Sequence, residues 1–523
     1  MKLLRKALCL LLATMMVALT LLACGDDGET ATSGGTQTSG KPDAVSSGNL
    51  PQDGDDTPNI PSELYFDDHP EIRFIVTNGD SNSGEELPAR SIDIDEDADM
   101  GYDVNKAVND RNNKVEEQLG VSIVLKQVVD MSHLSETLQP ILLSGLDEYD
   151  VVSGFEYYDI GITLDSSTSG TFLNYNAIPE DEMYIDVTKP YWDDDLYNEL
   201  AYNGAAYWIS GDLSQAWVGS IYVSFVNKRI WELYAEQIKQ MTGSSDIYKI
   251  VEDGKWTLDL WCELSRMAYV DSNANEMVDE GDQVGYMTYK PNLGSIMSDG
   301  LAGGSHVTYT KWEDGVPQVD FFNDHNTEFA GKLYRLYYES NALLIDGAVA
   351  EQYLLTTWAE GKSLFTVNLL SNSELYLNDM NDDYYIVPVP KLNEDQAEYT
   401  TVNHDSISLY GIPASCEHVA ATTATLELMA YYSYKLVTPA YYDVALKERY
   451  SRDPKTAEMV DQIRESLYSD FVALWAEECG GCTHFLRTNI NKHFASEART
   501  KQRTWQRQLE KLLEKIENSA FLE

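Results

Sequence analysis

The stretch Glu71-Ile-Arg-Phe-Ile-Val-Thr77 decides the fold class, together with the patterns that follow it. Its β-branched and aromatic residues predict a strand. Apolar residues at helical spacing predict a helix over 103–119, and Val121-Ser-Ile-Val-Leu125 predicts a second strand. A second helix is expected over 134–143 and a third strand over 149–152. This alternation of strands and helices indicates an α/β protein with a mostly parallel sheet.

The alternation restarts further along the chain. The expected strands are 221–227, 364–367 and 385–387, and the expected helices are 229–241, 257–267 with Thr257 as N-cap, 457–475 and 496–516. The C-terminal quarter is therefore expected to be helical. From Ser62 to the end there are about 460 residues, which is too many for one core, so at least two lobes are expected.

The N-terminus has the pattern of a secretory signal peptide over residues 1–23. A basic hexapeptide comes first, a run of apolar residues over 7–22 follows, and Leu21-Leu22-Ala23-Cys24-Gly25 ends it. The apolar run is at the short end for crossing a hydrocarbon core about 30 Å thick, which favours a signal peptide over an uncleaved anchor. The final string is similar to the bacterial lipoprotein box, so Cys24 is the expected lipid attachment site. Two acyl chains on one residue hold a protein stably at a membrane.

Residues 24–61 are expected to form a flexible acidic linker. Gly, Ser, Thr, Asp and Pro dominate this segment, and large apolar side chains are almost missing from it. Such a composition cannot bury enough surface to offset its ordering entropy. With the lipid on Cys24, the segment is predicted to tether the folded part to the cell membrane, on its extracytoplasmic face.

The formal net charge of −49 limits the partners of the chain. A nucleic-acid surface needs clustered Lys and Arg, so no nucleic-acid partner is expected. Adsorption to anionic lipid head groups is disfavoured for the same reason. The charge is consistent with solubility on an exposed surface.

Cys479-Gly-Gly-Cys482 is the one CxxC motif of the chain. A c-type haem site needs His directly after the second Cys, and Thr483 stands there. A structural zinc site needs a second ligand pair, which the sequence does not contain. A local disulfide or two unreactive thiols are the remaining interpretations.

Several strings, in order along residues 62–523, resemble extracellular solute-binding proteins of ABC importers, of the carbohydrate-binding type found in clostridia. They are Asp103–Val121, Tyr149–Val152, Gly211-Asp212, Phe225–Lys228, Asp246–Asp259, Asp383–Lys391, Gly411–Pro413 and Thr438–Tyr442. The string Asp246-Ile-Tyr-Lys-Ile-Val-Glu-Asp-Gly-Lys-Trp-Thr-Leu-Asp259 is the most specific of them.

The resemblance implies a periplasmic-binding-protein-like type II fold, with two α/β lobes, an interlobe cleft for the ligand and a helical C-terminal segment. A hinge of this kind closes around its ligand. The implied first lobe is 62–200 and 360–435, the second is 201–359 and 436–523, and the crossings lie near 170–215, 350–365 and 430–440. The implied function is capture of a mono- or oligosaccharide and its delivery to ABC permease subunits, with no catalytic residue and no required cofactor.

Sugars present apolar ring faces and a belt of hydroxyls, so their sites combine aromatic rings with polar side chains. Loops at the carboxyl ends of strands bring such groups together. The candidate ligand-binding residues, taken from loops where similar proteins contact their ligands, are Asp80, Tyr157, Trp217, Ser220, Asn368 and Ser371. Replacement of Trp217 by Ala is expected to weaken binding and to change the melting temperature of the free protein by only a few degrees.

The loop from Asp271 to Asp282 is a candidate calcium site. Asp271, Asn273, Asn275, Asp279 and Asp282 place oxygen side chains at positions 1, 3, 5, 9 and 12 of a twelve-residue loop. Position 6 is Glu276 where the turn favours Gly, and position 12 is the shorter Asp rather than Glu. The alternative interpretation is a solvated acidic turn.

Two other classes of function are compatible with the sequence. A carbohydrate-active enzyme needs two carboxylates about 5 to 10 Å apart, and so acidic a chain offers many pairs. A surface adhesion or scaffold protein is the second alternative, although repeats are missing. The sequence contains no GxSxG, HExxH or Walker motif.

Overall fold

The computed structural model describes residues 56–78, 87–92, 102–130, 133–164, 170–291, 296–345, 351–377, 380–442 and 454–520. All of these ranges belong to the unit Ser47–Glu523. The signal peptide, Cys24, most of the linker and Asp80 lie outside these ranges. Within them, no helix combines the length and the apolar character needed to span a bilayer.

The first lobe is built on a four-stranded sheet of order β11-β3-β1-β2. Its strands are β1 (Glu71–Asn78), β2 (Ser122–Asp130), β3 (Val151–Phe155) and β11 (Ser408–Gly411). β1 pairs in parallel with β2 and β3, and β11 runs antiparallel to β3. The three strands predicted in this part of the sequence are confirmed, and β2 extends five residues beyond its predicted end at Leu125.

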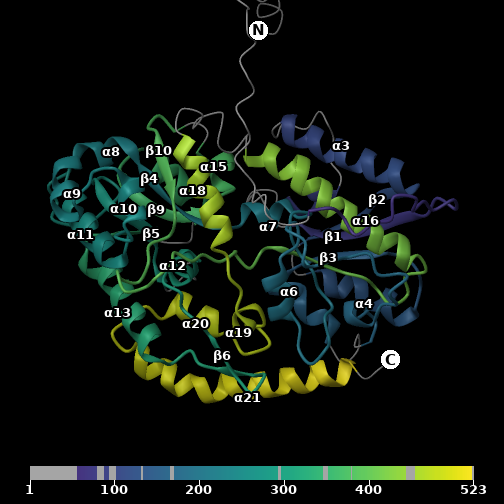
Figure 1. Ribbon diagram of the computed structural model, residues 1–523. Coiled ribbons are helices and arrows are strands. Elements are labelled where there is room, and N and C mark those ends of the chain that lie inside the picture. The colour runs from purple at the N-terminus through teal and green to yellow at the C-terminus, as the bar shows by residue number, and fades with distance from the viewer. Residues whose placement is uncertain are drawn as a thin grey trace, which may run out of the picture. The chain divides into compact units, whose positions relative to one another are not determined.

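Helices cover both faces of this sheet (Figure 1). They are α2 (Leu87–Ile92), α3 (Tyr102–Leu119), α4 (Leu134–Ser144) and α16 (Val419–Tyr432). The period of two along β1 decides which face each side chain meets. Phe74 and Val76 join the apolar cluster that holds Val115 of α3, whereas Ile75 joins the cluster that holds Leu138 of α4.

The second lobe is built on a five-stranded sheet of order β10-β4-β9-β5-β8. Its strands are β4 (Tyr222–Asn227), β5 (Val284–Tyr289), β8 (Leu343–Ile345), β9 (Ser363–Leu369) and β10 (Tyr384–Val387). β4 runs antiparallel to β9 and β10, and β5 runs parallel to β8 and β9. The architecture predicted from the sequence, two α/β lobes with a helical C-terminal segment, is confirmed.

The predicted lobe boundaries require a correction. Residues 360–435 were assigned to the first lobe, but β9 and β10 pair with β4 in the second sheet, and only the part from β11 onward belongs to the first. β9 is buried along its whole length, which shows that both faces of the second sheet are covered at this strand. The chain therefore crosses between the sheets over 388–407, after β10, rather than near 350–365.

The helix predictions hold in most places and fail where a local break intervenes. Thr257 Oγ1 accepts a hydrogen bond from the backbone N–H of Leu260 (3.3 Å) and caps α11 (Leu258–Ala268), as predicted. The single helix predicted over 229–241 is two helices, α8 (Lys228–Leu233) and α9 (Ala235–Thr242), because Tyr234 leaves the helical conformation. The helix predicted over 457–475 is likewise divided, into α18 (Pro454–Glu465) and α19 (Phe471–Leu474).

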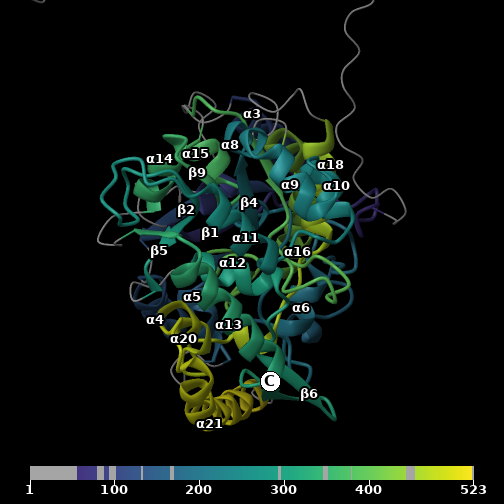
Figure 2. The same cartoon turned by 90° about the vertical axis from the view of Figure 1, so that its left-hand side faces the viewer.

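The remaining elements connect and cover these two sheets (Figure 2). They are α5 (Glu156–Asp159), η1 (Ile160–Thr163), η2 (Tyr175–Ala177), α6 (Asp194–Leu200), α7 (Gln215–Gly219), α10 (Ile247–Glu252), α12 (Met297–Gly304), β6 (Thr310–Glu313), β7 (Val316–Val319), α13 (Asp324–Glu339), α14 (Glu351–Ala359), α15 (Asn372–Leu375), η4 (Ser433–Val437), α20 (Cys482–Thr488) and α21 (Phe494–Ala520).

The long helix α21 runs beneath both lobes (Figure 1). Near its middle, Gln506 accepts a hydrogen bond from the backbone N–H of Val319 in β7 (2.9 Å). Near its end, the hydroxyl of Tyr207 donates to Ser519 Oγ (2.9 Å). The C-terminal helix thus contacts both the second lobe and the segment that leads into α7.

Cys479 and Cys482 are both fully buried, and both are free thiols. Burial raises the pKa of each thiol above its ordinary value, so both are protonated at neutral pH. The interpretation as two unreactive thiols therefore describes this structure.

Glu427 joins the N-terminal edge of the described chain to the first lobe. Its buried carboxylate on α16 accepts hydrogen bonds from the Tyr191 hydroxyl (2.6 Å), the Trp192 indole N–H (2.8 Å) and the backbone N–H groups of Asn59 (3.0 Å) and Asp186 (3.3 Å). Burial raises the pKa of Glu427, although these donors oppose the shift. A buried acceptor with four donors is costly to remove, because each donor would lose its partner.

We expect Glu427→Ala to lower the free energy of unfolding by about 3 kcal/mol, since several buried donors lose their acceptor. Urea denaturation followed by fluorescence measures the change. Glu417→Ala, at an exposed position just before the same helix, is the matched control and should change stability by less than about 0.5 kcal/mol. Equal stabilities for the two variants would contradict the role given to Glu427.

Candidate ligand-binding site

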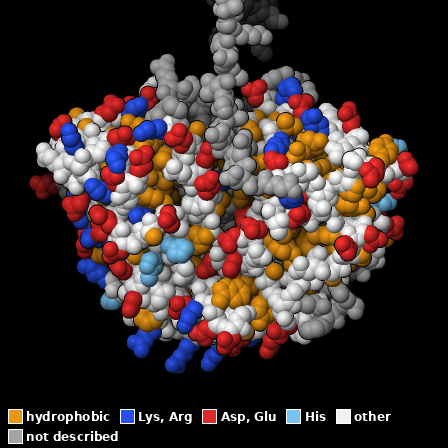
Figure 3. Space-filling model, in the orientation of Figure 1, with side chains coloured by type: hydrophobic (Ala, Val, Ile, Leu, Met, Phe, Trp, Pro, Cys, Tyr) orange, Lys and Arg blue, Asp and Glu red, His pale blue; other side chains and the backbone are white. Residues whose placement is uncertain are grey.

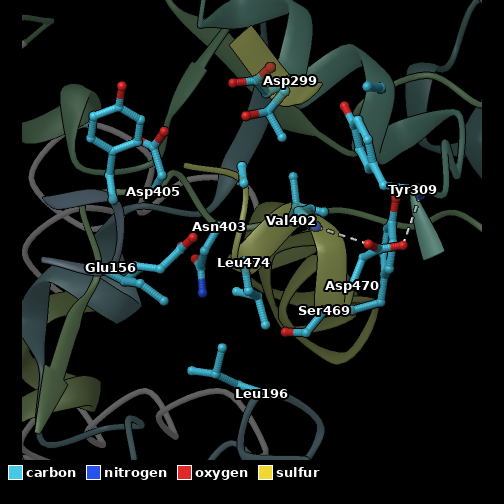
Figure 4. A pocket seen from close by; sticks show the side chains of 18 of the residues that line it. Glu156, Leu196, Asp299, Tyr309, Val402, Asn403, Asp405, Ser469, Asp470 and Leu474 are labelled. Carbon is cyan, nitrogen blue, oxygen red and sulfur yellow. Dashed lines mark hydrogen bonds between the residues drawn. The ribbon is translucent and has the colours of Figure 1, made fainter. Parts of the chain in front are cut away.

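A cavity lies where the two lobes and the C-terminal segment meet (Figure 4). The first lobe contributes residues of α5 and α6, the second contributes α12, and the crossover contributes residues 402–407. The segments 467–478 and 483–487 complete its walls. Backbone hydrogen bonds from Glu156 N to Ile407 O (3.1 Å) and from Tyr157 N to Asp405 O (3.1 Å) hold α5 against the crossover.

Among the described residues that line the cavity, Arg487 is the only Lys or Arg. Its Nε donates to Asp299 Oδ2 (2.6 Å), and its Nη2 donates to Asp405 Oδ2. Burial alone would raise the pKa of Asp405, but attraction to Arg487 and His404 outweighs burial and lowers it to about 2. Asp405 is therefore ionised. Burial raises the pKa of Asp299 to about 7, against the attraction of Arg487.

Two other carboxylates of the wall are engaged in structural hydrogen bonds. Asp470 caps α19 through Ala473 N (3.0 Å) and also accepts from the backbone N–H groups of Tyr309 (2.9 Å) and Thr310 (3.0 Å). Asp193 caps α6 through Leu196 N (2.9 Å) and accepts from the Trp217 indole N–H (3.0 Å). Both side chains form part of the wall, and their carboxylate oxygens already accept hydrogen bonds from the protein.

Glu156 differs from these residues because it is 6% exposed and its carboxylate makes no hydrogen bond within the described part of the chain. Figure 4 shows the side chain extending from α5 toward Asn403. Burial, and then repulsion by Asp405, raise its pKa well above the ordinary value, against the attraction of Arg487. Among the carboxylates of the cavity, Glu156 is therefore the one best placed to meet a ligand.

The cavity also has aromatic and aliphatic surface. Tyr157, a predicted ligand-binding residue, lines it, and its hydroxyl lies 3.3 Å from both ring nitrogens of His484. Tyr309 lines it as well and stacks on Phe321, with ring centroids 5.0 Å apart. Val402, Leu196 and Leu474 supply aliphatic contacts. Apolar patches beside hydrogen-bonding groups match the two kinds of surface that a sugar presents.

A second cavity adjoins the first and shares Asp193 and Leu467 with it. Its other lining residues are Pro190, Trp192, Asp194, Asp195, Trp217, Tyr434, Asp461, Arg464 and Glu465. On the face drawn in Figure 3, acidic side chains gather near the middle of the molecule. The two adjoining cavities offer space for a ligand longer than one ring.

Trp217 stands between the two cavities. The side-chain amide of Asn403 makes two hydrogen bonds to Trp217. Its oxygen accepts from the indole Nε1–H (3.1 Å), and its nitrogen donates to the backbone carbonyl oxygen (3.2 Å). Asn403 lines the first cavity and Trp217 lines the second. The guanidinium of Arg464 lies 5.3 Å from the centre of the Trp217 ring. Arg464 in turn pairs with the buried Asp212.

Trp217 is only 5% exposed, so it also has a structural role, and the expectation that its loss leaves the free protein's stability nearly unchanged is revised. We expect Trp217→Ala to cost about 3–5 kcal/mol of unfolding free energy, since it leaves a cavity and an Asp193 carboxylate without its donor. Trp217→Phe should cost less, because it retains most of the buried ring. Denaturant titration distinguishes these values.

Trp312→Ala is the control for this experiment, because Trp312 is 42% exposed. It should cost clearly less than Trp217→Ala, since little buried surface is lost. A Trp217→Ala variant as stable as the unmodified protein would show that the ring is not part of the core.

Ser220, Asn368 and Ser371 line neither cavity. All three are buried where β4 and β9 meet α7, and the backbone N–H of Ser371 donates to Gly219 O (2.9 Å). Asn368 Oδ1 accepts from Asn372 Nδ2 (2.6 Å), while its own Nδ2 is buried without a hydrogen bond. Their assignment as ligand-binding residues stays a prediction, as does that of Asp80, which lies outside the described residues.

Sequence reasoning did not select Glu156, Asp405 or Arg487. Glu156 carried a usable signal, because it directly follows a buried strand, but the adjacent Tyr157 was preferred. Asp405 lies in a crossover and Arg487 on a short C-terminal helix. Neither has a local pattern that distinguishes it from other charged residues.

The loop from Asp271 to Asp282 folds around its own backbone. Asp271 accepts from the N–H groups of Asn275 (3.2 Å) and Glu276 (3.0 Å), and Asp282 accepts from Ser272 N (2.9 Å). Asp279 accepts from Asn273 Nδ2 (3.0 Å). Across the described ranges, no group of three or more His, Cys, Asp or Glu side chains is arranged to hold a metal ion. The calcium site stays a prediction of the sequence.

A calcium ion that binds this loop only in the folded state would stabilise that state, by an amount that grows with the logarithm of the calcium concentration above Kd. The melting temperature should then be higher in calcium than in chelator, and Asp279→Asn should abolish the difference. Asp314→Asn, in the exposed turn between β6 and β7, is the control and should retain it. Identical melting curves in calcium and chelator would contradict the prediction.

Comparison with known proteins gives distant likenesses. No protein-family model matches the sequence, and no curated protein matches it. An ABC transporter solute-binding protein from Thermotoga lettingae, bound with α-D-tagatose, is similar at a TM-score of 0.48 and 11% identity, over 85% of this chain and 99% of that one.

Two further solved structures are similar to a comparable degree. The maltose/maltodextrin-binding domain from Bdellovibrio bacteriovorus, bound to maltotriose, has a TM-score of 0.49 and 12% identity, over 85% of this chain and 100% of that one. An ABC substrate-binding protein from Listeria monocytogenes, in complex with cycloalternan, has a TM-score of 0.49 and 11% identity, over 87% and 100%. At such values, the function has to be inferred from the residues of this chain.

Proposed function

We propose that this protein captures a mono- or oligosaccharide between its two α/β lobes and delivers it to an ABC permease. The observation that carries the proposal is the cavity between the lobes, whose wall combines Glu156, Asp299 and Asp405 with the rings of Tyr157 and Tyr309. Carboxylates accept hydrogen bonds from sugar hydroxyls, and aromatic rings cover the apolar faces of the sugar.

The position of the cavity supports capture by closure. Its walls come from both lobes, and the crossover 402–407 forms one of them. A relative movement of the lobes about such crossovers would open and close the site. The adjoining second cavity, with Trp192 and Trp217, would extend the site for a second sugar ring.

Membrane attachment and the permease partner complete the proposal. Their support comes from the sequence: the lipoprotein-like string ending at Cys24, the polar segment after it and the order of strings that resemble importer-binding proteins. A lipid on Cys24 would hold the receptor at the extracytoplasmic face of the cell membrane, close to its permease. No cofactor is needed for this function.

A carbohydrate-active enzyme is the second candidate. One observation favours it: Glu156 and Asp405 line the same cavity, and their surroundings move their pKa values in opposite directions. Such a divergence is typical of a general acid and its ionised partner. Asp405, however, is already paired with Arg487, which reduces its capacity to act as a base or nucleophile.

In a screen of saccharides, we expect at least one to raise the melting temperature of the purified protein, because a ligand that prefers the folded state stabilises it by RT ln(1+[L]/Kd). Tyr157→Ala should weaken the resulting affinity by roughly tenfold, about 1.4 kcal/mol, since the variant removes an aromatic surface of the cavity. Isothermal titration calorimetry measures the change.

Tyr158→Ala is the matched control, because the neighbouring ring is half exposed and lies outside the cavity lining. It should retain the affinity of the unmodified protein. Hydrolysis of the bound saccharide would assign the cavity to the enzyme class. Amino acids or peptides that stabilise the protein while saccharides do not would overturn the sugar-binding proposal.

A further inference from the structure

The wall of the first cavity has a large excess of negative charge. Within the described part of the chain, its acidic residues are Glu156, Asp193, Asp299, Asp405, Asp470, Glu477 and Glu478, and its single cationic residue is Arg487. Arg487 pairs with Asp299 and Asp405, whereas Asp193 and Asp470 are satisfied by the hydrogen bonds described above. The excess is therefore concentrated on the remaining carboxylates.

Three residues of this wall carry a carboxylate oxygen that accepts no hydrogen bond from the described part of the chain. The Glu156 carboxylate makes no hydrogen bond within the described part of the chain, and it is 94% buried, being 6% exposed. Asp299 Oδ1 and Glu478 Oε2 are buried without a hydrogen bond as well. All three residues line the cavity, and the Glu156 carboxylate is the one of the three that makes no hydrogen bond through either oxygen within the described residues.

A neutral sugar could donate hydroxyl hydrogen bonds to Glu156, but it brings no positive charge to favour the ionised carboxylate in this buried place. Removing water from a carboxylate is costly unless an opposite charge replaces it. An ammonium group supplies both the charge and up to three N–H donors. The arrangement therefore matches a ligand with a cationic amino group better than a neutral one.

We propose that the ligand is an amino sugar, whose ammonium group pairs with Glu156 while its ring contacts Tyr157 and the aliphatic wall. This inference rests on the proposed function and specifies its substrate class. Asp299 Oδ1 and Glu478 Oε2, which are buried without a hydrogen bond in residues of the same wall, add to its negative potential.

The electrostatic surroundings of Glu156 make this preference dependent on pH. The charged groups that face it are Asp405, Glu478 and Asp299, which repel its negative charge, and Arg487, which attracts it. With the pKa of Glu156 raised, the carboxyl holds a proton over part of the range in which free carboxylates are ionised. A bound ammonium group favours the ionised form, so the affinity for an amino sugar should decrease as the pH is lowered.

The experiment uses three β-1,4-linked disaccharides that differ only at carbon 2, with a free amino group, an acetylated amino group or a hydroxyl. Isothermal titration calorimetry of the full-length protein should show the amino form binding at least about tenfold more tightly than either neutral form at about pH 7. The preference should diminish as the pH is lowered, because Glu156 then takes up a proton and can no longer pair with the ammonium group.

Glu156→Gln keeps the shape of the side chain and removes its charge. It should reduce the preference for the amino form by about tenfold or more, while the melting temperature of the free protein stays equal or rises at about pH 8, because an unpaired buried charge is removed. Glu417→Gln makes the same change of charge at an exposed position outside the cavity and should leave both the affinity and the preference unchanged.

The outcomes separate this inference from the proposed function. Equal or tighter binding of the neutral disaccharides would leave the sugar-binding function intact and overturn the amino-sugar assignment. An unaltered preference in Glu156→Gln would also overturn the assignment to this carboxylate. If no saccharide binds in any assay, both proposals fail, and binding of spermidine alone would indicate a polyamine site.

Discussion

Arg487 holds together three parts of the chain that are distant in sequence. Its guanidinium joins Asp299 at the start of α12 in the second lobe to Asp405 in the crossover between the sheets, and Arg487 itself belongs to α20 of the C-terminal segment. It is 7% exposed, so water screens these attractions only weakly. Without this cation, several carboxylates would face one another across a buried space.

Arg487 compensates only part of the negative charge in the cavity wall, and the remaining carboxyl groups bear on the choice of ligand. One guanidinium can satisfy two carboxylates, which leaves the Glu156 carboxyl without a partner within the described residues. A buried carboxyl without a partner lowers stability, so its presence in the wall of a cavity points to a ligand that supplies the missing partner. The same carboxylates that favour a ligand would, in a different geometry, support hydrolysis, which is why a turnover assay accompanies the binding assays.

Trp217 and the residues that it contacts lie at the boundary between the two cavities. Trp217 contacts Asp193 and Asn403 on the side of the first cavity and Arg464 on the side of the second. Because the ring is buried in the core as well, it couples the shape of the site to the stability of the fold. The mostly polar and small residues around Trp217 in the sequence do not indicate this double role. It depends on contacts with Asp193, which caps α6, and with Arg464 of α18, and neither is a sequence neighbour of Trp217.

The sequence by itself determined the local elements: the strands at the start of each lobe, the helix over 103–119, the cap at Thr257 and the amphipathic C-terminal helix. These depend on side chains within a few residues of one another, through periodicity and capping. Only the tertiary structure decided that β9 and β10 join the second sheet and that Glu156, Asp299, Asp405 and Arg487 share one cavity. Strand pairing and ion pairing act between residues that the chain separates by scores or hundreds of positions. A single sequence contains no local periodicity from which such contacts can be predicted.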